Sequence, residues 1–250
     1  MIALDPWAWA ALGVAAVVIG ISKTALPGSN ILAIALFATV LPARMSTAAM
    51  LLLLIVGDVF ALLAYRRHAN WPTILRLAPA VVVGLLAGFA FLALAGDGVV
   101  RRAIGVILLL MIAITLWRRW RQSRANAVTR EPGRGLVLAG VYGGLGGFST
   151  MVANAGGPVM SMYFLATRTP AQVFLGTAAW FFAIINLVKV PFLAGIGLFT
   201  PPVLLMDAVL APFVVVGALV GLAIAKRLDQ RLFDRLVIAL TIVGALYLLL

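Results

Sequence analysis

The sequence predicts an all-α polytopic membrane protein built from two inverted repeats. Three observations carry this prediction: an apolar composition, a series of long apolar segments, and two polar interruptions at matching places in the two halves. Of the 250 residues, 64% are hydrophobic and only 10% are charged. Soluble domains have about 25% charged residues, so the composition excludes a soluble protein. The mean hydropathy of +1.17 agrees with this.

Long and short apolar segments alternate with polar connections along the chain. A helix that crosses a bilayer needs about 20 residues, so we expect full spans where the segments are long and half-helices or re-entrant hairpins beside the interruptions. Each repeat is then a broken helix or hairpin followed by three full spans, which gives about 8 spans and about 10 helical segments. The segments are Trp7–Ile21, Gly28–Leu41, Met45–Tyr65, Ile74–Leu94, Val99–Trp117, Gly135–Phe148, Gly156–Leu165, Val173–Leu193, Pro202–Ala225 and Leu232–Leu250.

The two interruptions are Gly20–Asn30 and Gly147–Pro158, one half-chain apart. Polar, helix-breaking backbone at membrane depth is tolerated only where it is buried in protein or lines a cavity. Two interruptions at corresponding positions of two repeats indicate a transport site.

Helix-breaking residues recur in the same order in both halves. Pro79, Gly84 and Gly88 are followed 133 residues later by Pro212, Gly217 and Gly221, and Asp58 is followed 128 residues later by Asn186. Slowly growing offsets are typical of a duplication with small insertions. We therefore expect a first membrane repeat over residues 1–117, a basic cytoplasmic linker over 118–134 and a second membrane repeat over 135–250.

The distribution of Lys and Arg predicts the topology. If each broken segment is a hairpin, 14 basic residues lie on the cytoplasmic side and 3 outside; if each crosses once, the counts are 9 and 8. Cytoplasmic loops collect Lys and Arg, so the hairpin arrangement is favoured, with inverted halves and both termini outside. We expect a multi-pass protein of the bacterial cytoplasmic membrane, in contact with the lipid bilayer. The net charge of +12 is explained by these loops and not by binding to nucleic acid.

Hydroxyl, amide and glycine residues in the interruptions are the candidate substrate-binding residues. A helix that restarts after a break presents free N–H groups and the positive end of its dipole, which favours anions. Lys23 adds a positive charge, and neither interruption contains an acidic residue. The alternatives are that these side chains only satisfy freed backbone groups and that Lys23 reaches toward the membrane surface. The candidates are Ser22, Lys23, Thr24, Gly28, Ser29, Asn30, Ser149, Thr150, Asn154, Gly156 and Gly157.

Three further polar residues lie inside neighbouring spans and are expected to support or couple the site. Asp58 is costly in a membrane unless it is paired or protonated, so it could bind Lys23, carry a coupling proton or lock two helices together. Asn186 occupies the matching place in the other half, and Lys189 lies one turn beyond it, as a site residue or a snorkelling lysine. The coupling ion is expected to be a proton or sodium.

Catalysis and metal binding are not expected. The chain has no cysteine, and its single histidine, His68, lies in a basic loop. This makes a transition-metal site improbable and leaves no serine–histidine pair at one depth. We expect no cofactor and no enzyme activity, and the oligomeric state stays open.

Several motifs resemble the sulfite exporter TauE/SafE family, also called the TSUP family. They are Gly20-x-Ser22-Lys23-x-x-x-Pro27-Gly28, Gly143-Gly144-x-Gly146-Gly147 leading to Gly156-Gly157-Pro158, Pro42-Ala43-Arg44 before the span with Asp58, and Trp71 after the basic loop. The resemblance covers nearly the whole chain and implies transport of sulfur-containing anions such as sulfite and sulfonates. Ala25, Leu26 and Ser29 stand where the family has glycines, so the exact substrate stays open.

Together these observations predict a secondary transporter for a small anion, a sulfur oxyanion or organosulfonate, with the anion bound between the two breaks. Transport is expected to proceed by alternating access, with one half rocking against the other. An anion channel with the same site and a non-transporting membrane accessory protein are the alternatives.

Overall fold

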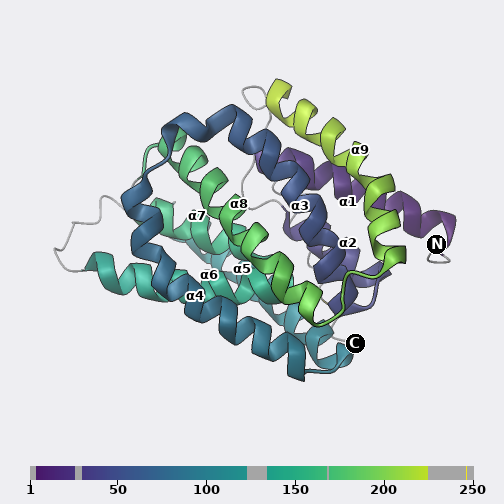
Figure 1. Ribbon diagram of the computed structural model, residues 1–250. Helices are drawn as coiled ribbons and strands as arrows, with labels where there is room; N and C mark the ends of the chain where they lie inside the picture. The colour runs from purple at the N-terminus through teal and green to yellow at the C-terminus, as the bar shows by residue number, and fades with distance from the viewer. Residues whose placement is uncertain (1–3, 26–29, 123–133, 168, 225–245, 247–250) are drawn as a thin grey trace.

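The computed structural model describes residues 4–25, 30–122, 134–167, 169–224 and 246, and every regular element in them is helical (Figure 1). Helices α1 to α5 come from the first half of the chain and α6 to α9 from the second. The elements are α1 (Pro6–Thr24), α2 (Ile31–Val40), α3 (Ala43–Tyr65), the short 3₁₀ helix η1 (Arg66–His68), α4 (Trp71–Leu94), α5 (Asp97–Gln122), α6 (Arg134–Ala153), α7 (Gly156–Ala166), α8 (Ala171–Gly195) and α9 (Pro201–Ile224).

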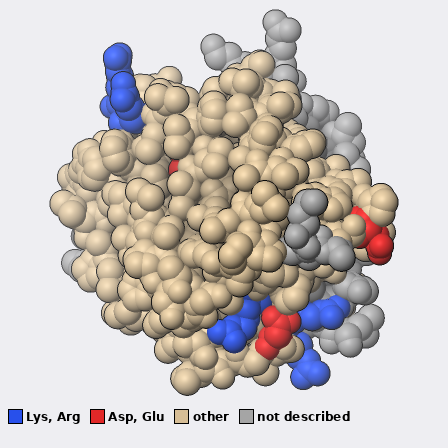
Figure 2. Space-filling view, turned by 45° about the vertical axis from the view of Figure 1, so that its right-hand side comes forward, with Lys and Arg blue, Asp and Glu red and all other residues tan. Residues whose placement is uncertain are grey.

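Within the described residues, α1, α3, α4, α8 and α9 are long and apolar enough to cross a membrane. Their outward-facing side chains are large and apolar, as at Val83, Leu86 and Leu205. Figure 2 shows a face on which most charged groups lie near the edges, while the broad area between them is uncharged except for a small acidic patch. Lipid is the solvent that such a surface requires. The predicted fold class, an all-α polytopic membrane protein, is confirmed, while the number of spans and the repeat relation stay predictions.

The helix breaks are shorter than the sequence predicted. Helix α1 continues through Ser22 and Lys23 to Thr24, and α6 continues through its glycine-rich run to Ala153. Serine, threonine and lysine are only mildly unfavourable in a helix, so they did not need to lie in the break. Several predicted break residues therefore form the last turn of a helix. The predicted span Leu232–Leu250 lies outside the described residues, apart from Leu246, and so does most of the predicted linker.

The closest helix contacts join the two halves of the chain. Helix α1 packs against α9, and α4 packs against α6. A Cβ atom on Gly20 of α1 would lie 2.2 Å from the carbonyl oxygen of Val214 in α9, and one on Gly147 of α6 would lie 2.3 Å from that of Val81 in α4. Gly20 and Gly147 are 127 residues apart, and Val81 and Val214 are 133 apart. The two helix pairs thus meet through corresponding residues, as pseudo-symmetric repeats would.

Helices α3 and α8 pack against each other at the centre but differ in their other neighbours. Helix α3 also packs along α1 and α9, whereas the described contacts of α8 with α4 are few and those with α6 slight. If α3 and α8 hold corresponding places in the two halves, as the sequence predicts, this difference is a departure from symmetry.

Candidate functional site

The two helix breaks meet. The side-chain Nδ2 of Asn30, at the start of α2, donates a hydrogen bond of 3.0 Å to the carbonyl oxygen of Asn154, which follows α6. Asn154 Nδ2 in turn donates to the Thr47 carbonyl oxygen of α3 at 2.9 Å, and Thr47 Oγ1 donates to the Val152 carbonyl oxygen at 2.8 Å. The bonds to the carbonyl oxygens of Asn154 and Val152 satisfy backbone groups that the break after α6 releases. They also fix the end of α6 to α3 and to the start of α2.

Asn154 reaches this position through an unusual backbone. Its φ of 54° is the only positive φ of a non-glycine residue in the described part of the chain. Asparagine tolerates the left-handed region better than most residues, and a residue of this conformation often ends a helix. The turn at Asn154 lets α7 begin with only two residues, Asn154 and Ala155, between it and the end of α6.

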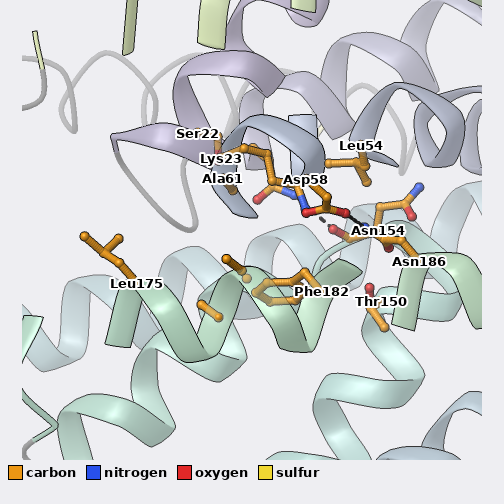
Figure 3. Close-up of a pocket in the computed structure, with 14 residues that line it drawn as sticks. Ser22, Lys23, Leu54, Asp58, Ala61, Thr150, Asn154, Leu175, Phe182 and Asn186 are labelled. Carbon is orange, nitrogen blue, oxygen red and sulfur yellow. Dashed lines mark hydrogen bonds and ion pairs between the residues drawn. The ribbon is translucent and has the colours of Figure 1, made fainter. Parts of the chain in front are cut away.

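An ion pair crosses from α1 to α3 beside the breaks. Lys23 Nζ lies 2.5 Å from Asp58 Oδ1, and Asn186 Nδ2 of α8 donates to Asp58 Oδ2 at 2.6 Å. The Lys23 ammonium also lies 5.0 Å from the ring centre of Phe182, within range of a cation–π interaction. Figure 3 shows Lys23 and Asp58 pointing toward each other, with Phe182 on the facing helix. Of the roles that the sequence left open for Asp58, the structure shows the bond to Lys23.

Lys189 lies deeper and has no acidic partner among the described residues. Its side chain is 0% exposed, and its Nζ donates to the Thr150 carbonyl oxygen at 2.6 Å and to Asn154 Oδ1 at 2.5 Å. A cation at the last carbonyls of a helix satisfies orphan acceptors and interacts well with the negative end of the helix dipole. Lys189 thus caps the end of α6 and does not reach the membrane surface. The Tyr65 hydroxyl holds the corresponding end of α1 by donating to the Thr24 carbonyl oxygen at 2.6 Å.

A pocket opens where these groups converge. The pocket has a volume of about 40 Å³, counted as the space that the centres of water molecules can reach. One water needs about 10–15 Å³ on this measure, so the pocket can hold a few waters or one small anion. Its predicted lining residues are Ser22, Lys23, Asn30, Asp58, Thr150, Asn154, Gly157 and Asn186. The apolar part of the lining consists of Leu54, Ala61, Leu175, Ala178, Ala179 and Phe182.

Four predicted residues do not line this pocket. Thr24 donates to the carbonyl oxygens of Gly20 and Ala218, and Ser149 lies within hydrogen-bond distance of the carbonyl oxygens of Gly146 and Ala155. Both therefore fit the alternative in which hydroxyls only satisfy backbone groups. The remaining two are Gly156 and Lys189.

Gly156 has a steric role beside the pocket. A Cβ atom there would lie 2.9 Å from Thr150 Cβ and 3.2 Å from Phe182 Cε1, so only glycine leaves both side chains in place. The other two predicted residues, Gly28 and Ser29, lie outside the described residues.

Sequence reasoning missed the apolar lining and Thr47. Phe182, Leu54 and the alanines carry no polar signal, and an apolar residue in a membrane helix is the ordinary case. Thr47 lies in the first turns of α3, outside both interruptions, and only the fold brings it to Val152. The hydroxyl group of Thr47 within an otherwise apolar span was the signal that could have identified it.

The charges of the pocket are balanced in this arrangement. Among its lining residues, Lys23 and Asp58 are charged and of opposite sign, and Lys189 adds a positive charge behind the wall. Within the described residues, no group of three or more His, Cys, Asp or Glu side chains could hold a metal ion.

Comparison with known protein families identifies the family of this chain. The family profile described as sulfite exporter TauE/SafE matches residues 12–248, nearly the whole chain. No curated protein and no solved structure matches. The resemblance seen in the motifs along the chain is thereby confirmed, and with it the assignment to membrane transport. The chain belongs to the sulfite exporter TauE/SafE family of membrane transporters.

Proposed function

We propose that this protein is a secondary transporter that moves a small anion, a sulfur oxyanion or an organosulfonate, across the bacterial cytoplasmic membrane. The observation that carries the proposal is the meeting of two helix breaks at one pocket lined by the Lys23 ammonium. Discontinuous helices that converge on a buried site are the usual substrate-binding device of secondary transporters. The anion binds between Lys23 and the starts of α2 and α7.

Anion binding follows from three features of the pocket. Lys23 supplies a full positive charge, and Asn30 and Gly157 place the N-terminal ends of α2 and α7 against the pocket. The first N–H groups of a helix have no partner within the helix and carry partial positive charge. The available volume fits a compact anion of a few heavy atoms and excludes a long organic chain.

Alternating access is supported by the asymmetry between α3 and α8. The pocket extends past Asp58 toward Ala61 near the end of α3 and toward Leu175 near the start of α8. That end of the two helices adjoins η1 with Arg66 and Arg67, which the charge distribution assigns to the cytoplasm. If the two halves exchange their conformations, α3 leaves α1 and α9, α8 packs onto α4 and α6, and the site opens to the other side.

Binding is tested with purified protein in detergent. Sulfite, thiosulfate, sulfate, sulfoacetate, taurine and simple carboxylates are titrated while the thermal unfolding midpoint is followed, because a ligand of the folded state raises it. The decisive pair of variants is Asp58→Asn and the double variant Lys23→Met with Asp58→Asn. They differ only at Lys23, and neither leaves a buried carboxylate without its cation.

The expected result is stabilisation by one class of anion in the wild type and in Asp58→Asn, and none in the double variant. Arg67→Gln, which removes an exposed cation of η1, serves as the control and keeps binding. Stabilisation of the double variant by the same anion would contradict the site. No shift with any anion would favour an accessory role.

Transport itself is tested in proteoliposomes by counterflow of the anion identified. A carrier takes up labelled anion in obligatory exchange for unlabelled internal anion, at a rate that saturates, whereas flux through a channel does not depend on such an exchange and is hard to saturate. The Asn30–Asn154 hydrogen bond closes the breaks against each other in this state, so we expect saturable exchange.

A further inference from the structure

Asp58 occupies the place at Lys23 that a substrate anion would take. Its Oδ1 lies 2.5 Å from Lys23 Nζ, and both residues line the pocket. The carboxylate is 2% exposed and is held from its other side by Asn186 Nδ2 at 2.6 Å. Asp58 therefore behaves as a built-in anion in the site.

An incoming anion has no other described ammonium to bind in the pocket. Lys189 is completely buried and does not line the pocket, and its Nζ already donates to the Thr150 carbonyl oxygen and to Asn154 Oδ1. Lys23 is the charged donor within reach. A substrate anion and the Asp58 carboxylate must therefore share or exchange one ammonium.

Two negative groups at one ammonium in a buried site repel each other strongly, because little water is present to screen them. The Asp58 carboxylate is buried and is held in its position by Lys23 and Asn186. A proton on the carboxyl group removes its negative charge without moving it. The protonated group also becomes a donor toward the new anion.

We propose that the anion replaces the Asp58 carboxylate as the partner of Lys23, and that one proton binds Asp58 in the same event. This inference rests on the proposed function and assigns the proton as the coupling ion. Anion and proton then travel in the same direction. Asn186 holds the corresponding place in the second half, so the proton site exists in one half only.

The groups that face Asp58 fit this exchange. Helix α1 contributes Lys23, α8 contributes Asn186 and the more distant Lys189, and α9 faces the neighbouring Gly57 with the apolar Val214. No second acidic side chain among the described residues lines the pocket. The proton therefore has one described carboxylate to bind there.

The experiment measures proton uptake together with anion binding. Thiosulfate and methanesulfonate are the probes, because their charges stay fixed across the neutral pH range. Binding is followed by calorimetry in two buffers of different ionisation enthalpy, which gives the number of protons taken up. The variants are wild type, Asp58→Asn and the control Asp207→Asn, which changes a buried carboxylate of α9 outside the pocket.

In the wild type we expect uptake of about one proton per anion and an affinity that rises about tenfold for each unit that the pH falls. The Asp207→Asn variant should show the same proton uptake and the same pH dependence of affinity as the wild type. Asp58→Asn binds the anion more tightly at alkaline pH, takes up no proton and loses the pH dependence.

Three results would overturn the inference: wild-type binding without proton uptake, uptake that persists in Asp58→Asn, or uptake that is lost in Asp207→Asn. If Asp58→Asn does not fold, the wild-type proton count alone decides. If neither probe binds the wild type, but another anion of the panel does, the count is repeated with that anion. If no anion binds at all, the proposed function fails first.

Discussion

At the scale of single residues, the site depends on a few buried polar groups whose partners come from distant parts of the chain. Lys23 and Asp58 are 35 residues apart, and Asn186 is 128 residues beyond Asp58. A buried ion pair contributes little net stability, but a buried charge that loses its partner is strongly destabilising. Net stability therefore does not explain why this pair is present.

The first prediction concerns this pair. Lys23→Met leaves Asp58 buried beside Asn186 without its cation, which should reduce the free energy of unfolding by about 3–5 kcal/mol. Adding Asp58→Asn should recover most of this loss, because both charges are then absent. Thermal unfolding of the single and double variants measures the coupling. Equal losses in both variants would show that the two charges do not stabilise each other.

The second prediction concerns the backbone of Asn154. Asn154→Gly and Asn154→Ala both remove the side-chain bonds to Thr47 and Lys189, but only alanine is strained at a φ of 54°. The alanine variant should be less stable than the glycine variant by about 1 kcal/mol. Unfolding midpoints of the two variants give this difference directly. A glycine variant that is no more stable than the alanine variant would mean that the turn relaxes.

At the scale of elements, the existence of the breaks could be predicted from the sequence, but their extent could not. Glycine, proline and polar residues inside apolar segments marked both places. The glycine-rich run of α6 nevertheless stays helical, because Gly143, Gly147 and their neighbours pack directly on α4. Glycine lowers the helix propensity of an isolated helix. Between membrane helices it is nevertheless favourable, because it lets two backbones approach closely. From a single sequence, a glycine that ends a helix cannot be distinguished from a glycine that lets two helices pack closely.

The third prediction compares two glycines of α6. Gly147→Ala would place a methyl group 2.3 Å from the Val81 carbonyl oxygen, so α4 and α6 must move apart and we expect a loss of at least about 2 kcal/mol. At Gly140 nothing lies within 4 Å, and Gly140→Ala should be neutral or stabilising by up to about 1 kcal/mol. Thermal unfolding of both variants tests the contrast. Equal stability would show that the helix contact is not tight.

At the scale of the whole molecule, the two halves are interleaved. Helix α1 of the first half packs on α9 of the second, and α4 of the first half packs on α6 of the second. Rocking of one half against the other, as the repeats alone suggested, would break both of these contacts. We expect instead that α1 with α9 and α4 with α6 each move as one unit, while α3 and α8 change neighbours.

The fourth prediction tests these units. The Cβ atom of Ala80 in α4 lies 2.9 Å from the Cβ position of Gly143 in α6, so a cysteine pair there can form a disulfide after a small adjustment. The chain has no cysteine of its own, which leaves the pair without competitors. Oxidised Ala80→Cys with Gly143→Cys should transport as well as the reduced protein in counterflow. Transport that stops on oxidation and resumes on reduction would support rocking of the halves.

The helix partners themselves could not be predicted from the sequence. Composition and charge were enough to predict the fold class, because they indicate whether a segment lies in lipid or in water. Pairing requires knowing which face of each helix meets protein, and lipid-facing residues such as Val83 are as apolar as the buried Val81 beside them. The sequence also suggested Lys23 and Asn154 for the site but not that Lys189 would cap α6, since that bond depends on how α8 passes the end of α6.

The pairing of α1 with α9 also constrains how the protein is made. Helix α1 is synthesised well before α9, so the surface at Gly20 that accepts Val214 and Ala218 stays without its partner until almost 200 more residues have been synthesised. During that time the groove at Gly20 must be filled by lipid, by another early helix or by an insertion factor. Because the contacts that close the molecule are long in sequence separation, they form late. The first half made alone therefore cannot complete its own core, and the fold is completed only after α9 has been synthesised.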